Sequence, residues 1–198
     1  DIQQNGKTAI SHTVTLTNLF SAGHAVSYSF ILQGIAIENV RVFAGDEILP
    51  FTLERGETTT TIKITFPQAV VGKGKSRIFT IQYEDQITAI QNGRVWEVTI
   101  PRIQNGKNYE SYELRLVVPK DFGQPAYLSP KPLRQETGSI QTTYIFSGEQ
   151  ISEVGINGAF GAFQVFTFDL AYHLKNPLKT RGITRIALPP DTAFQRVY

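Results

Sequence analysis

The sequence predicts an all-β fold of two antiparallel immunoglobulin-like β-sandwich modules, with one short helix in the second module. Three observations predict it. Apolar and polar residues alternate along most segments, β-branched and aromatic side chains occupy the apolar positions, and turn residues separate the segments at regular intervals. Each such sandwich needs roughly 100 residues. The 198 residues of this chain are therefore enough for two such sandwiches.

The first module is predicted to span residues 1–90. In its first strand the even-numbered positions from Ile10 to Leu16 are Ile, His, Val and Leu, whereas the odd-numbered positions from Ser11 to Thr17 are Ser or Thr. Because successive side chains of a strand point to opposite faces, we expect one buried face and one solvated face. The same alternation predicts further strands around residues 28–32, 40–42, 49–53, 62–66 and 79–83.

The second module is predicted to span residues 91–198, with the boundary inside residues 85–92. No Gly/Ser-rich or Pro-rich linker occurs at this boundary, so we expect the modules to be held against each other. Gln-Asn-Gly recurs at residues 4, 91 and 104; either a duplication or recurrence of a common hairpin signal explains this. Strands are expected at residues 96–100, 114–118, 140–146, 163–174 and 183–188.

A proline-rich segment interrupts the alternation between residues 119 and 132. Four prolines and Gly123 exclude both a helix and a central strand there, because proline fixes φ and lacks an N–H donor. We therefore expect an extended connection between two sheets. Residues 126–128 are the part of it expected to pair at a sheet edge.

One short helix is predicted at residues 147–155. Ser147 precedes Gln150 by three residues, which is the spacing of a capping box, and Gly155 can adopt the left-handed terminating conformation. Ile151 and Val154 fall on one face of this helix.

Composition excludes several classes of function. The formal net charge is +2 and the charged residues are dispersed, so the chain has no nucleic-acid-binding footprint. It contains no cysteine, which excludes disulfides, thiolate metal sites and cysteine nucleophiles. No apolar run is long enough for a membrane span. Because the chain also lacks methionine, we expect it to be a processed form or a part of a longer protein.

Residues able to hold a metal do not cluster in the sequence. His12, His24 and His173 are not spaced as paired ligands, so we predict no metal and no other cofactor. The acidic pairs at residues 46–47 and 84–85 lack the ladder of a dedicated calcium loop. At residues 84–85 a solvated turn is a better explanation than a low-affinity calcium site between the modules.

Hydrolytic chemistry also lacks a clear signature. There is no Gly-x-Ser-x-Gly elbow, and the Val-Gly-Lys-Gly-Lys run at 71–75 lacks the strand–helix context of a phosphate loop. Asp169 is the one acid in an apolar context, where a buried acid, an edge-strand guard or a catalyst would fit equally.

Aromatic residues offer the only candidate ligand site. Trp96, Tyr109, Tyr112 and Tyr127 could form a platform for sugars. The alternative is that Trp96 is a core residue, as single tryptophans of sandwiches usually are. Because Val98 and Ile100 continue its face just after the module boundary, we expect Trp96 to be mostly buried near the seam of the modules.

Several segments carry a family resemblance: Val-Val-Gly-Lys-Gly-Lys at 70–75, Asn-Gly-Arg-Val-Trp-Glu-Val-Thr-Ile-Pro at 92–101, the proline-rich stretch 119–132, and residues 187–197. In these the chain resembles the N-terminal β-sandwich ectodomain of bacterial secreted transglutaminase-like proteins. The resemblance implies a location outside the cell or at its surface, and a catalytic domain that begins after Tyr198. The family's Cys–His–Asp set has no counterpart here, because the chain has no cysteine.

The leading functional hypothesis is a non-catalytic spacer or interaction region that presents this downstream domain of the same polypeptide. Alternatives are a carbohydrate-binding module and a self-assembling surface-layer or filament subunit. A cell-surface protein or glycan is the expected external partner; nucleic acid is not. At the carboxyl end, Pro189 and Pro190 are expected to end the last strand. Ala193, Phe194 and Val197 are then expected to pack either on the second module or on the region that follows it.

Overall fold

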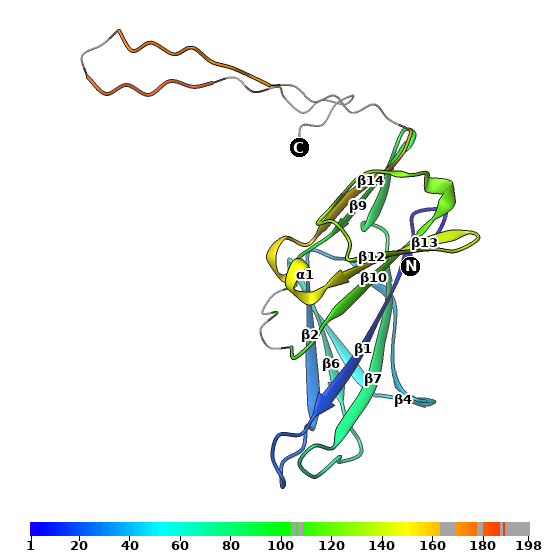
Figure 1. Cartoon of the computed structure of the whole chain (residues 1–198). Helices are drawn as coiled ribbons and strands as arrows, with labels where there is room; N and C mark the ends of the chain where they lie inside the picture. Colours follow the sequence, from blue (N-terminus) through cyan, green and yellow to red (C-terminus); the bar gives the residue numbers. More distant parts are fainter. Residues whose placement is uncertain (104–105, 107–108, 163–168, 178–179, 187, 189–198) are drawn as a thin grey trace. The chain divides into compact units, whose positions relative to one another are not determined.

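The computed structural model describes residues 1–103, 106, 109–162, 169–177, 180–186 and 188. The chain divides into two units, Asp1–Val165 and Phe166–Tyr198, which are described separately. In the first unit the strands form four antiparallel sheets, and one α-helix is present among the described residues (Figure 1). The all-β prediction is confirmed.

The first two sheets enclose one hydrophobic cluster. Their strand orders are β1-β7-β3-β4 and β2-β6-β5. The cluster includes Ile81 and Phe79 from the first sheet and Ile62 and Ile64 from the second, each at most 1% exposed. The strands are β1 (Thr8–Thr17), β2 (Ser27–Gln33), β3 (Glu38–Ala44), β4 (Glu47–Ile48), β5 (Phe51–Arg55), β6 (Thr59–Thr65) and β7 (Ser76–Asp85).

Strand β1 shows why alternation predicted the fold. It pairs with β7 along its whole length without a bulge. The side chains from Ile10 to Leu16 at even positions lie against the cluster, whereas Ser11 and the threonines at odd positions from 13 to 17 are exposed. Residues paired across two strands point to the same face of the sheet. Val14 therefore pairs with Phe79 on the buried face, and Thr13 pairs with Thr80 on the exposed face.

The other two sheets enclose a second cluster. Their strand orders are β10-β13-β12 and β11-β14-β9-β8. Phe146, Phe160 and Val98 are fully buried at its centre. The strands are β8 (Ala89–Asn92), β9 (Val95–Ile100), β10 (Glu113–Pro119), β11 (Pro125–Ser129), β12 (Arg134–Thr137), β13 (Gln141–Ser147) and β14 (Ile156–Gly161).

The proline-rich segment connects the two sheets of the second sandwich, as predicted. It leaves β10, forms the short 3-10 helix η2 (Lys120–Phe122) and continues as β11, which is an edge strand of the other sheet. The chain then returns to the first of these sheets as β12. Pro125 and Pro119 fit because they lie at strand termini, where a missing N–H costs least.

The predicted helix is α1 (Gly148–Val154), and its boundaries follow local chemistry. The Ser147 side chain accepts from the Gln150 N–H, and the Gln150 side chain accepts from the Ser147 N–H at 3.0 Å. Gly155 ends the helix at φ +70°. A Cβ atom at residue 155 would lie 2.5 Å from the Ile100 carbonyl oxygen, so only glycine fits.

Two predicted strands are corrected. Residues 169–174 and the described part of 183–188 form no strand, and the apolar side chains of Leu174 and Ile183 are exposed. Alternation defines a face but supplies no partner strand, and these segments make no ladder among the described residues. Residues 163–168 and the predicted packing residues Ala193, Phe194 and Val197 lie outside the described residues.

The second unit, taken alone, contains one hydrogen bond made by the Asn176 side chain. The Asn176 side-chain amide donates to the Thr180 carbonyl oxygen at 2.9 Å. Pro177 follows Asn176 directly, and Asn-Pro favours the start of a turn.

The two hydrophobic clusters divide along the sequence with one exception. The first contains residues between Ile10 and Tyr83, and the second contains residues between Ala89 and Phe160. Ile2 is the exception, because it precedes the first sandwich but lies in the second cluster. The chain therefore passes between the two sandwiches twice, once between Ile2 and Ile10 and once between Tyr83 and Ala89.

Candidate functional site

Side-chain and backbone hydrogen bonds meet at the junction of the two sandwiches, and the first group of them is made by Asp85. This carboxylate is 2% exposed. Its Oδ1 accepts from the N–H groups of Ile87 (3.0 Å) and Thr88 (2.9 Å), and its Oδ2 accepts from the Thr88 hydroxyl (2.8 Å). Charge-assisted bonds of this kind are stronger than neutral ones, and they offset the cost of burying the charge. The turn from β7 to β8 is therefore fixed in one conformation.

The N-terminal segment connects the two sandwiches a second time, in addition to the turn from β7 to β8. The Ile2 N–H donates to the Val117 carbonyl oxygen of β10 at 2.9 Å, and the Ile2 side chain is 5% exposed in the second cluster. The Gln4 side-chain amide donates to Asp121 Oδ2 at 2.6 Å. Only from Thr8 onward does the chain belong to the first sandwich. The segment thus ties β1 to the neighbouring sandwich.

Trp96 lies at this junction. Its indole stacks on the Phe122 ring, with ring centroids 4.0 Å apart and planes 3° from parallel. A Cβ atom at Gly6, whose φ is +85°, would approach the indole Cζ3 to 2.7 Å. The indole is partly buried against the second cluster. Glycine at position 6 is thus needed for both its backbone angle and its closeness to the indole.

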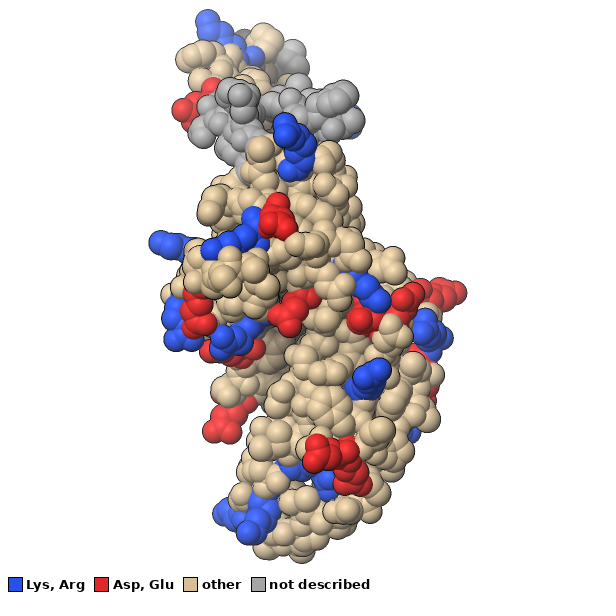
Figure 2. All heavy atoms as spheres, turned by 90° about the vertical axis from the view of Figure 1, so that its right-hand side faces the viewer, with Lys and Arg blue, Asp and Glu red and all other residues tan. Residues whose placement is uncertain are grey.

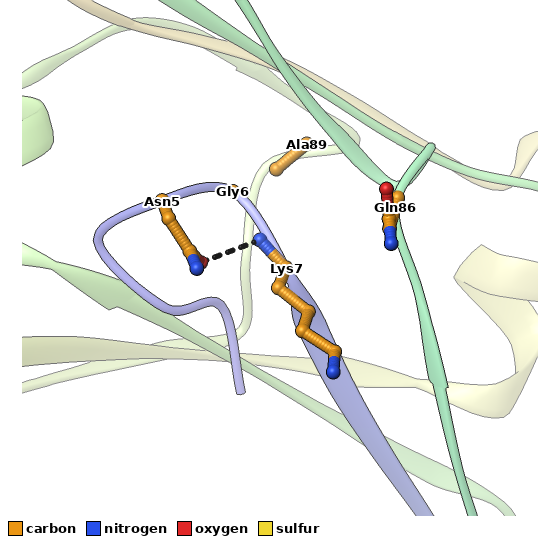
Figure 3. A pocket seen from close by; sticks show the side chains of 5 residues that line it. All are labelled: Asn5, Gly6, Lys7, Gln86 and Ala89. Atoms are coloured by element: carbon orange, nitrogen blue, oxygen red, sulfur yellow. Dashed lines mark hydrogen bonds between the residues drawn. The ribbon is translucent and has the colours of Figure 1, made fainter. Parts of the chain in front are cut away.

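A small hollow lies between the N-terminal segment and the turn from β7 to β8 (Figure 3). Its volume is about 220 Å³, below the usual range of about 300–1,000 Å³ for ligand pockets. Asn5, Gly6 and Lys7 line it from the N-terminal turn, and Gln86 and Ala89 line it from the segment after β7. Asn5 is held by accepting a hydrogen bond from the Lys7 N–H at 3.0 Å.

Lys7, the lysine that lines this hollow, forms an ion pair with Glu84. Lys7 Nζ lies 2.8 Å from Glu84 Oε2, and the Asn39 side chain donates to the same carboxylate oxygen. The hydrogen bond to Glu84 raises the pKa of Lys7, and the bonds from Lys7 and Asn39 lower the pKa of Glu84. Both groups are therefore held in their charged forms.

A second hollow of about 320 Å³ lies where the proline-rich connection leaves β10. Its lining is mostly amide and hydroxyl side chains, and the phenol of Tyr144, whose pKa is raised by burial, forms part of its wall. Lys120 is its only charged lining residue. Among the described residues, neither hollow is lined by a pair of Asp or Glu side chains. The lining residues are Val118, Pro119, Lys120, Gly123, Gln124, Gln135, Thr137, Thr142 and Tyr144.

The four predicted sugar-binding residues take different positions. Trp96 faces the cluster together with its cross-strand partner Phe160, whereas Tyr127 pairs with Ala159 and lies on the opposite face of the same sheet. Tyr109 and Tyr112 precede β10, with ring centroids 6.0 Å apart. The structure brings these two tyrosines together and separates Trp96 from Tyr127. Carbohydrate binding stays a prediction.

Tyr109 and Tyr112 contribute to an aromatic seam with the first sandwich, which sequence reasoning missed. Burial raises the pKa of Tyr28, and electrostatic interaction with Tyr109 and Tyr112 raises it further. Burial is also the main cause of the raised pKa values of Tyr83 and Tyr112. No local signal marks this seam, because its members come from residues far apart in the sequence.

The three histidines are separate. His12 lies in β1, where its Nε2 is 3.0 Å from the Tyr83 hydroxyl, and burial lowers its pKa to about 4. His24 is exposed in a loop, and His173 belongs to the second unit. No group of three His, Cys, Asp or Glu side chains suited to a metal occurs among the described residues. Asp169 is exposed and outside any strand.

Surface charge is mixed on the face drawn in Figure 2. Lys and Arg side chains alternate there with Asp and Glu, without a continuous basic stripe such as nucleic-acid-binding surfaces carry. Among the helices that the structure describes, none has the length and hydrophobicity to span a bilayer. No protein-family model matches the chain, and no curated protein is significantly similar to it.

Proposed function

We propose that the chain is a non-catalytic scaffold that holds two β-sandwiches in a fixed relation and positions a neighbouring region of the same polypeptide. The observation that carries this proposal is the double connection at the junction. The buried carboxylate of Asp85 fixes one crossing, and the insertion of Ile2 into the second cluster fixes the other. A protein that only needed to link two domains would not require either feature.

The aromatic seam supports the same proposal. Tyr28 of the first sandwich interacts with Tyr109 and Tyr112, which precede β10 of the second sandwich. Three separated contacts resist rotation between two bodies better than a single flexible link does. An exported, cell-surface setting completes the proposal, and it rests on the resemblance to secreted transglutaminase-like ectodomains.

Hydrogen exchange of the purified chain tests the fixed junction. We expect the N–H groups of Thr88 and Thr99, which bond to Asp85 and to the Thr88 carbonyl oxygen, to exchange as slowly as central strand amides. Exchange as fast as that of an open turn such as Gly93 would contradict the proposal. Reproducible hydrolase or transferase activity of the purified chain would contradict the non-catalytic part.

Self-assembly through an edge strand is a second candidate function, favoured by the composition of β1 and β2. Residues 8–37 contain no Asp, Glu, Lys or Arg, and this stretch forms two edge strands of the first sandwich. Most edge strands are protected by charges, prolines or bulges. β1 has none of these, whereas the edge strand β5 ends in Glu54 and Arg55.

A second copy of β1 would fit this edge. In an antiparallel pair about a two-fold axis, threonines would face serine or threonine on the outer side and apolar residues would meet on the inner side. Sedimentation over a concentration series tests this. Thr13→Lys should abolish any self-association, and Thr52→Lys on β5 is the matched control. A strictly monomeric wild-type chain, or equal effects of both variants, would contradict self-assembly.

A further inference from the structure

Two loops at one end of the first sandwich form a continuous surface, which we call the two-loop tip. It consists of residues 18–26, between β1 and β2, and residues 66–75, between β6 and β7. The Asn18 N–H donates to the Lys75 carbonyl oxygen (2.9 Å), and the Gly74 N–H donates to the Asn18 carbonyl oxygen (2.8 Å). The Asn18 side chain also donates to the Val70 carbonyl oxygen. Figure 1 shows both loops at the same end of this sandwich.

Large apolar side chains are exposed in both loops of the tip. Leu19 is 73% exposed and Phe20 is 74% exposed, and Val71 of the neighbouring loop is 51% exposed. Single exposed apolar residues are common on proteins and need no explanation. A cluster differs, because contiguous apolar surface marks interaction sites. Among the described residues no other adjacent pair of large apolar side chains is exposed to this extent.

The charge of the tip has a single sign. Neither loop contains Asp or Glu, and Lys73 and Lys75 are both exposed. Neither lysine takes part in the ion pairs found among the described residues. By contrast, the exposed Ile48 follows Asp46 and Glu47 directly.

This combination matches the chemistry of an anionic lipid surface. Apolar side chains that lie at the headgroup level of a bilayer leave water, and nearby lysines are attracted to lipid phosphates. An acidic residue in the tip would oppose such binding, and the tip has none.

We propose that the two-loop tip binds anionic lipid bilayers, with Leu19 and Phe20 inserted among the headgroups and Lys73 and Lys75 against lipid phosphates. This goes beyond the scaffold proposed above, because it fixes one end of the first sandwich at a membrane surface. The binding is peripheral and uses loops only.

Flotation of the purified chain with phosphatidylcholine vesicles, with and without phosphatidylglycerol, tests the proposal. We expect binding to the anionic vesicles that weakens with salt. Leu19→Ser with Phe20→Ser should reduce it at least about tenfold. Lys73→Gln with Lys75→Gln should reduce it about fivefold per lysine. Leu133→Ser with Ile140→Ser is the matched control, since these side chains are 67% and 77% exposed elsewhere.

A Phe20→Trp variant gives an independent readout. Its fluorescence should shift to shorter wavelength when anionic vesicles are added, because an inserted indole leaves water. No shift, no wild-type flotation, or equal flotation of the Leu19/Phe20 double variant would overturn the proposal. Oligomers that form without vesicles and dissociate in that double variant, with no flotation, would also overturn it and assign the tip to protein contacts.

Discussion

The ionisation of His12 is coupled to folding, because folding buries its ring. Its ring lies beside Phe30, with ring centroids 4.7 Å apart, and it shares a hydrogen bond with the Tyr83 hydroxyl. Burial lowers its pKa to about 4 from an ordinary value of 6.5. The unfolded chain therefore takes up a proton before the folded chain does as the pH falls. The stabilising contribution of neutral His12 is complete above pH 6.5 and is lost between pH 6.5 and pH 4.

We predict that the free energy of unfolding falls by about 2 kcal/mol between pH 7 and pH 5 because of His12. Urea unfolding at each pH measures this. The pKa of Glu84 is lowered below its usual 4.5, so this carboxylate contributes little in that window. His12→Gln should lower stability but flatten the pH dependence. An unchanged slope in this variant would exclude His12 as the cause.

Trp96 is predicted to be a structural residue. Trp96→Ala should lower the free energy of unfolding by about 3 kcal/mol, at the low end for a buried aromatic, because the indole stacks on Phe122 but is only partly buried. Trp96→Phe should lose less than half as much, since it keeps a stacked ring. Denaturant titration measures both. A change below about 1 kcal/mol for Trp96→Ala would make the sugar platform the better explanation.

At the scale of single elements, α1 depends on its capping box. Ser147→Ala removes an acceptor for the Gln150 N–H and should destabilise the chain by about 1 kcal/mol. The control is Ser152→Ala, because the Ser152 hydroxyl bonds the Gly148 carbonyl oxygen within the helix, where such a bond adds little. Thermal melts of the two variants provide the comparison. Equal shifts would contradict a specific role for the cap.

The β7–β8 turn depends on Asp85. Asp85→Ala leaves the N–H groups of Ile87 and Thr88 and the Thr88 hydroxyl without their acceptor. We expect a loss of about 3 kcal/mol in unfolding free energy and faster exchange of the Thr88 amide. Asp85→Asn keeps one acceptor and should lose clearly less. An alanine variant as stable as the wild type would show that solvent satisfies these groups.

Elements with a local cause were predictable from the sequence. The alternation from Ile10 to Leu16 specified β1 and its buried face, and the Ser147–Gln150 spacing with Gly155 specified both ends of α1. Strand pairing beyond residue 168 was wrongly predicted, because alternation is the same whether or not a partner strand exists. The insertion of Ile2 into the second cluster has no local signal, since it depends on where β10 lies in space.

The candidate site was the least predictable part for the same reason. Aromatic type alone grouped Trp96 and Tyr127 on one predicted surface. Their strand register puts them on opposite faces. The acidic pair at residues 84–85 was expected to be a solvated turn, but Asp85 is buried and bonds the backbone that follows it. That difference depends on burial, which residue type does not encode.

At the scale of the whole molecule, the central claim is that the two sandwiches form one rigid body. The chain has no cysteine, so two introduced cysteines can be spin-labelled selectively. Thr52 on β5 and Ile140 before β13 are exposed positions on different sandwiches. Thr52 and Thr15, both exposed on the first sandwich, provide a reference pair within one body.

Pulsed electron–electron double resonance on these labelled pairs is the most direct test. A rigid junction predicts one distance for the Thr52–Ile140 pair, with a distribution no broader than that of the Thr52–Thr15 pair. Asp85→Ala should broaden the first distribution and leave the second unchanged. A broad or multiple distribution for the Thr52–Ile140 pair in the wild-type chain would contradict the scaffold.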